Sequence, residues 1–103
     1  MEYAALILAG AQQQLHRLFD HEAPDQPLDL DELHRRVAHM VLHLLGKDLG
    51  RLLHILYRVD VAEHQVKQAM LLPSHEEVAG QLARLIIKRE LQKAQTRFIY
   101  RSN

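Results

Sequence analysis

Residues 74–101 read SHEEVAGQLARLIIKRELQKAQTRFIYR, and apart from Gly80 they contain no residue that breaks a helix. The segment therefore predicts a single helix of about 28 residues, which at 1.5 Å per residue would be about 42 Å long. A compact domain of about 100 residues is only about 30 to 35 Å across. We therefore expect the helix to extend past its own domain, with residues 88–103 as the projecting end.

The two halves of this helix differ in composition. The first half carries apolar residues typical of a core: Val78, Leu82, Ala83, Leu85, Ile86 and Ile87. The second half mixes charged residues with Leu91, Ala94, Phe98 and Ile99. Apolar side chains on an unsupported projection are poorly tolerated in water. Either the end frays, or a second copy of the chain or another protein covers it.

Three capping signatures mark helix starts along the chain, the last of them at the start of the long helix. Each has an oxygen-bearing residue followed three positions later by Glu, whose carboxylate can return a hydrogen bond to the backbone of the cap. The pairs are Asp29 with Glu32, Asp60 with Glu63, and Ser74 with Glu77. With the apolar spacing of three and four, they predict four helices before the long one. Their approximate ranges are 2–19, 30–45, 48–59 and 61–72.

The segment 48–59 is apolar almost all round. Only Arg51, His54 and Arg58 form a polar stripe on it, and such breadth is typical of a helix at the centre of a fold. No segment alternates apolar and polar residues with a period of two, so no strand is predicted. We expect a single all-α domain over 1–103, a compact bundle of about five helices with a long C-terminal helix.

Composition excludes several classes of protein. The chain has 103 residues, 13 Lys plus Arg against 13 Asp plus Glu, and no cysteine. It therefore has no disulfide and no thiolate metal site. The apolar run YAALILAGA near the start follows Glu2 and is about half of the roughly 20 residues that span a bilayer. We interpret it as a buried helix face, and expect a cytoplasmic protein without a membrane partner.

A basic stripe is the most conspicuous charge feature. Its members Arg89, Lys93, Arg97 and Arg101 recur every fourth residue and so share one helix face. With Phe98 they form the candidate interaction surface. The stripe is compatible with phosphate binding, with a solvated face that suits the negative end of the helix dipole, or with an acidic partner segment at residues 20–32 of a second chain.

Candidate chemistry is sparse. His39 and His43 lie one helical turn apart and could chelate one ion, but they project from the polar face of their helix. Ser74 is used as a cap, and Thr96 and Ser102 lie in or beyond the exposed tail, so no nucleophile stands out. No glycine-rich loop is present for a nucleotide. We predict no catalytic, cofactor or metal residues, and a protein that is not an enzyme.

At the end of the third segment, Asp60 is expected to act as a cap, with an ion pair to Arg58 compatible with that role.

The segments KDLGRLLHILYRVDVAEHQVKQAM and ARLIIKRELQKAQTR resemble a family of small all-helical bacterial proteins of uncharacterised function. Phrases similar to LLYRIDV and LIIERQLQK recur in that family. The resemblance covers roughly residues 29–101 and implies a helical fold in the bacterial cytoplasm. It implies no activity, so no functional residue follows from it.

The leading functional hypothesis is a non-catalytic protein–protein interaction or adaptor-type protein, expected to self-associate as a homodimer through its first and last helices. One alternative is nucleic-acid binding through the basic C-terminal helix. A second is a histidine-based metal-binding bundle.

Overall fold

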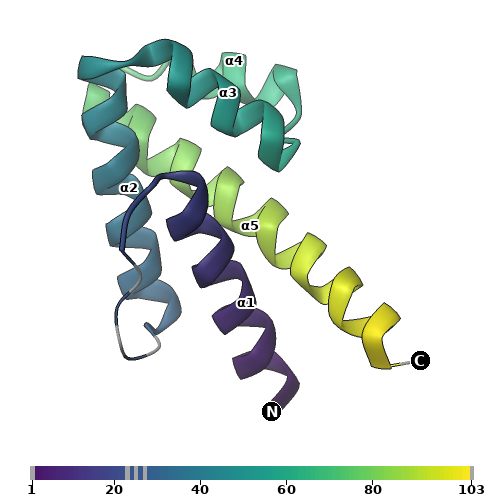
Figure 1. The fold of residues 1–103 in the computed structure, drawn as a ribbon. Coiled ribbons are helices and arrows are strands. Elements are labelled where there is room, and N and C mark those ends of the chain that lie inside the picture. The colour runs from purple at the N-terminus through teal and green to yellow at the C-terminus, as the bar shows by residue number, and fades with distance from the viewer. Residues whose placement is uncertain (1, 23, 25, 27, 103) are drawn as a thin grey trace.

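Five α-helices make up the chain in the computed structural model, which describes residues 2–22, 24, 26 and 28–102 (Figure 1). They are α1 (Glu2–Leu18), α2 (Leu30–Lys47), α3 (Leu49–Val59), α4 (Glu63–Met70) and α5 (His75–Ser102). The structure is 83% helical, and no strand occurs within these residues. The all-α prediction is confirmed, as is a terminal helix of 28 residues.

The helix α5 is the backbone of the fold, because each of the four other helices packs against it. Figure 1 shows α1 and α2 on the same side of α5, with α3 and α4 together at the opposite end of the molecule from both chain ends. The predicted core face of α5 is confirmed, since Val78, Leu82, Ala83, Ile86 and Ile87 are all buried. Buried apolar residues from all five helices meet this face in one continuous core.

The prediction that the segment 48–59 lies at the centre is wrong. The helix α3 buries one face, which consists of Leu52, Ile55, Leu56 and Val59. Its second apolar face is in water: Leu49 is 44% exposed, Leu53 46% and Tyr57 82%. An apolar pattern shows which residues avoid water, but it does not show whether the chain supplies a neighbour for every such face. Here α2 and α5 cover one side of α3 only.

The projecting end predicted over 88–103 is shorter than expected. The molecule measures 42 × 28 × 21 Å and is therefore elongated. Its long axis equals the expected length of α5, whereas the prediction assumed a roughly spherical domain. In addition, α1 packs against α5, and both Glu90 and Ala94 are buried. Over residues 95–101 no side chain is fully buried, and Ile99, Tyr100 and Arg101 are exposed; Asn103 lies outside the described residues.

Two of the three predicted helix starts have their caps. The Ser74 hydroxyl accepts from the Glu77 amide at 3.1 Å, and a Glu77 carboxylate oxygen accepts from the Ser74 amide at 3.2 Å, which is a complete capping box. Asp29 accepts from the Glu32 amide at 2.8 Å. A fourth cap was not predicted: Asp48 accepts from the Arg51 amide at 3.0 Å and starts α3.

The predicted cap at Asp60 is wrong. Asp60 ends α3 in the left-handed conformation, with φ 71°, and the Val61 amide donates back to the Leu56 carbonyl. This is a Schellman ending in which Asp takes the position usually held by glycine. Asp20 has φ 57° and ends α1 in the same way. The helix α4 begins instead behind Ala62, whose side chain cannot accept a hydrogen bond.

Replacing Ser74 by alanine is expected to lower the free energy of unfolding by about 1 kcal/mol, because the Glu77 amide loses its acceptor at the start of α5. Urea unfolding followed by circular dichroism measures this loss. The matched control is Thr96→Ala, which removes a hydroxyl bonded to the Gln92 carbonyl within the same helix. If the two variants lose equal stability, the cap contributes nothing specific.

Candidate interaction surfaces

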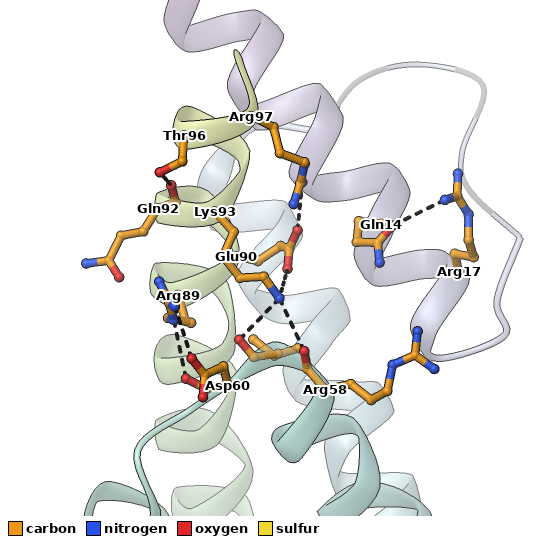
Figure 2. Close-up of polar contacts among 11 residues, drawn as sticks. Gln14, Arg17, Arg58, Asp60, Arg89, Glu90, Gln92, Lys93, Thr96 and Arg97 are labelled. Atoms are coloured by element: carbon orange, nitrogen blue, oxygen red, sulfur yellow. Dashed lines mark hydrogen bonds and ion pairs between the residues drawn. The ribbon is translucent and has the colours of Figure 1, made fainter. Parts of the chain in front are cut away.

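The first half of the predicted basic stripe caps the C-terminal end of α3 (Figure 2). Arg89 donates to the Asp60 carboxylate at 3.1 Å and to the Asp60 carbonyl at 3.3 Å. Lys93 donates from Nζ to the carbonyls of Arg58 and Val59, at 3.2 and 3.4 Å. The last carbonyls of a helix lack partners within it and form the negative end of its dipole. These two cations therefore fasten α3 to α5.

The next residue of the stripe, Arg97, holds a buried carboxylate. Glu90 is 0% exposed, and its Oε1 accepts from Arg97 Nη2 at 2.9 Å. The Lys93 ammonium lies 3.9 Å from Glu90 Oε2. Within the described residues Oε2 has no hydrogen-bond partner. A buried charge is costly unless it is paired, so Arg97 and Lys93 are what allow this carboxylate in the core.

The structure thus brings Arg89, Lys93 and Arg97 together as predicted, but directs them toward partners in their own chain. The ring of Phe98 is half-buried and Arg101 is exposed. The acceptors of these cations were missed: Asp60 pairs with Arg89, whereas the sequence suggested Arg58. A charged residue at the end of one helix and a basic residue 29 positions later give no local signal of contact. Donors already occupied in this way argue against a phosphate-binding face.

An apolar stripe on α3 is exposed, which the prediction of a central helix did not anticipate. We define the α3 stripe as Leu49, Leu53 and Tyr57, which recur every fourth residue. The same helix also exposes three polar residues, Arg51, His54 and Arg58. They line a pocket on the α1 side of α3, together with Gln14, Arg17, Leu18 and Ile55. The stripe was visible as the second apolar face of segment 48–59. Exposed apolar faces of this kind are typical of contact with another molecule.

A groove runs between the start of α2 and the middle of α5, with a volume of about 600 Å³. It is lined by Leu30, Asp31, His34, Arg84, Ile87, Lys88 and Leu91. The His34 Nε2 donates to the Gly80 carbonyl at 3.2 Å and links the two helices beneath it. Sequence reasoning named Ile87 and Leu91 as apolar residues of the long helix but predicted no groove. Its members come from two helices about 50 positions apart, so only the fold brings them together.

The histidines do not gather around a common point. His39 and His43 are both exposed on α2. Within the described residues no group of three or more His, Asp or Glu side chains could hold a metal ion. His16 is buried and donates from Nδ1 to the Gln12 carbonyl at 2.7 Å. The Gln12 side chain in turn accepts from the Leu28 amide at 2.9 Å, so this pair ties α1 to the segment before α2.

None of the helices, over the residues that the structure describes, is both long and apolar enough to cross a bilayer.

The chain was compared with protein-family models, with curated proteins and with solved structures. None of these comparisons finds a match, so the resemblance to small helical bacterial proteins stays a prediction.

Proposed function

We propose that this chain is a non-catalytic cytoplasmic protein that acts through protein–protein contact, first of all with a second copy of itself. The observation that carries the proposal is the exposed α3 stripe. The sequence-based hypothesis placed the contact on the first and last helices. Because α1 packs against α5 and Ala94 is buried, that surface needs less shelter than expected. The α3 stripe is the better candidate.

The spacing of the stripe suits contact between two identical helices. Leu53 lies midway between Leu49 and Tyr57, four residues from each. Two antiparallel α3 helices related by a two-fold axis at Leu53 would place Leu49 of each copy level with Tyr57 of the other. The same patch then serves on both sides, as a two-fold dimer requires. Gly50 follows Leu49, and a Cβ at this position would contact the Asp48 carboxylate at 3.7 Å.

The expected dimer is weak. Burial of apolar surface contributes about 25 cal/mol per Å², so a contact between the two stripes that buries roughly 400 Å² of apolar surface over both copies contributes about 10 kcal/mol. Association itself costs at least about 4 kcal/mol of lost translational and rotational freedom. We therefore expect a dissociation constant of about 0.1 mM, which corresponds to about −5.5 kcal/mol.

Sedimentation equilibrium over a concentration series tests the proposal. The wild-type mass is expected to rise toward that of a dimer at concentrations near 0.5 mM, about five times the expected dissociation constant. Leu53→Glu should stay monomeric, since it would place two carboxylates face to face on the two-fold axis. Leu53 is nearly half-exposed, so the variant should keep its helical circular dichroism spectrum.

The matched control is Leu6→Glu, which introduces the same charge at another exposed leucine, on α1. It should self-associate as the wild type does. A wild-type chain that sediments as a monomer throughout the series would remove the proposal. Equal dimerisation by Leu53→Glu would move the contact away from α3.

A further inference from the structure

The groove between α2 and α5 combines an apolar interior with charge on its edges. Ile87 is buried beneath it, Leu91 is half-buried, and Leu30 on the α2 wall is 50% exposed. Its volume of about 600 Å³ lies within the range of about 300 to 1,000 Å³ that is typical of small-molecule sites. An aliphatic chain that packs against these three residues would be removed from water, and it would displace the water that now contacts the groove.

The two cations on the α5 edge of the groove differ from the others on that helix. Arg89, Lys93 and Arg97 are each in an ion pair. Among the residues that the structure describes, Arg84 donates only to the neutral amide of Gln81, at 3.3 Å. Lys88 has no hydrogen bond or ion pair among the described residues. Arg84 and Lys88 lie one turn apart, so one anionic group could bind both.

The charge balance of the groove favours a single negative charge. Two cations face one carboxylate, that of Asp31 on the α2 wall, which leaves an excess of one positive charge. A carboxylate carries one negative charge, whereas a phosphate monoester carries about −1.5 to −2 at neutral pH. The second charge of a phosphate would meet Asp31 without a cation to balance it. A quaternary ammonium would meet Arg84 and Lys88 directly.

We propose that this groove is a binding site for an aliphatic carboxylate, with its chain against Leu30, Ile87 and Leu91 and its carboxylate between Arg84 and Lys88. The carboxylate accepts charge-assisted hydrogen bonds from both side chains. The site is independent of the α3 stripe, and the proposal does not rest on self-association.

Titration of the isotope-labelled protein with decanoate, followed by amide chemical shifts, tests the proposal. We expect saturable binding of one equivalent with a dissociation constant of about 0.1 to 1 mM. The shift changes should centre on residues 30–34 and 84–91. Three further probes share the ten-carbon chain but differ in the head group: decanol, decyltrimethylammonium and decyl phosphate. Each should bind at least about tenfold more weakly than decanoate.

The double variant Arg84→Gln/Lys88→Gln should raise the dissociation constant for decanoate at least about tenfold, because both charge-assisted hydrogen bonds are lost. The control Arg17→Gln/Arg101→Gln removes the same charge from exposed positions outside the groove and should leave binding unchanged. Leu30→Asn should weaken decanoate and decanol alike, since it alters the apolar wall only. All these positions are at least partly exposed, and circular dichroism confirms that each variant is folded.

Four results would overturn the proposal. Equal affinity for decanol or decyltrimethylammonium would show adsorption without head-group recognition. Tighter binding of decyl phosphate would assign the site to phosphates. Shift changes centred on the α3 stripe would place the ligand elsewhere. A titration without saturable shifts would exclude the site altogether, and none of these results bears on sedimentation of the Leu53 variant.

Discussion

Replacing Arg97 by alanine is expected to lower the free energy of unfolding by about 3 kcal/mol, because a fully buried carboxylate loses its hydrogen-bond donor. Glu90 is 0% exposed and accepts from Arg97 at 2.9 Å. Lys93 cannot replace that donor readily, since its ammonium is directed to the carbonyls at the end of α3. The value is at the low end of the range for broken buried pairs because the Arg97 side chain is 44% exposed.

A double-mutant cycle separates this cause from a general loss of contacts. In a Glu90→Leu background no buried charge is left, so Arg97→Ala should cost less than about 0.5 kcal/mol there. Arg101→Ala, one turn further along the exposed end of α5, should also change stability by less than about 0.5 kcal/mol. An equal loss from Arg97→Ala in both backgrounds would show that the ion pair is not its source.

Truncation of Leu82 to alanine is expected to cost about 3 to 4 kcal/mol. Leu82 is fully buried on the α5 face onto which the other helices pack. Removal of its side chain leaves a cavity that helices held from several sides cannot close. For a domain of this size the loss corresponds to a fall of roughly 12 to 32 °C in Tm.

Thermal unfolding at low protein concentration measures this effect without a contribution from self-association. The matched control is Leu71→Ala, since Leu71 is exposed in the connection between α4 and α5. It should change the free energy of unfolding by less than about 0.5 kcal/mol. A loss at Leu82 no larger than at Leu71 would contradict the central position assigned to α5.

Local patterns were sufficient to predict the number of helices and most of their bounds. Pro73 with the Ser74 capping box located the start of α5 correctly, because both signals depend on backbone chemistry within one turn. At Asp60 the same type of pattern misled. Asp suits both an N-cap and a left-handed helix end, and only three residues separate α3 from α4. In the structure Asp60 ends α3, and its carboxylate accepts from Arg89, 29 positions away.

The candidate surfaces depend on tertiary packing and were less accessible. Segment 48–59 has two apolar faces, and burial of only one could not be inferred from their presence. The length of α5 was predicted correctly, but the conclusion that it overhangs assumed a spherical domain. The molecule is elongated, with α1 beside α5. Sequence reasoning assigned no role to Arg84 and Lys88, because their groove exists only where α2 lies opposite α5.

Both described ends of the chain lie far from α3, at the other end of the molecule (Figure 1). An affinity tag or a fluorescent protein fused to either terminus would therefore leave the α3 stripe uncovered. Immobilisation through such a tag presents α3 to the solution, and this orientation suits the capture of a second, untagged copy.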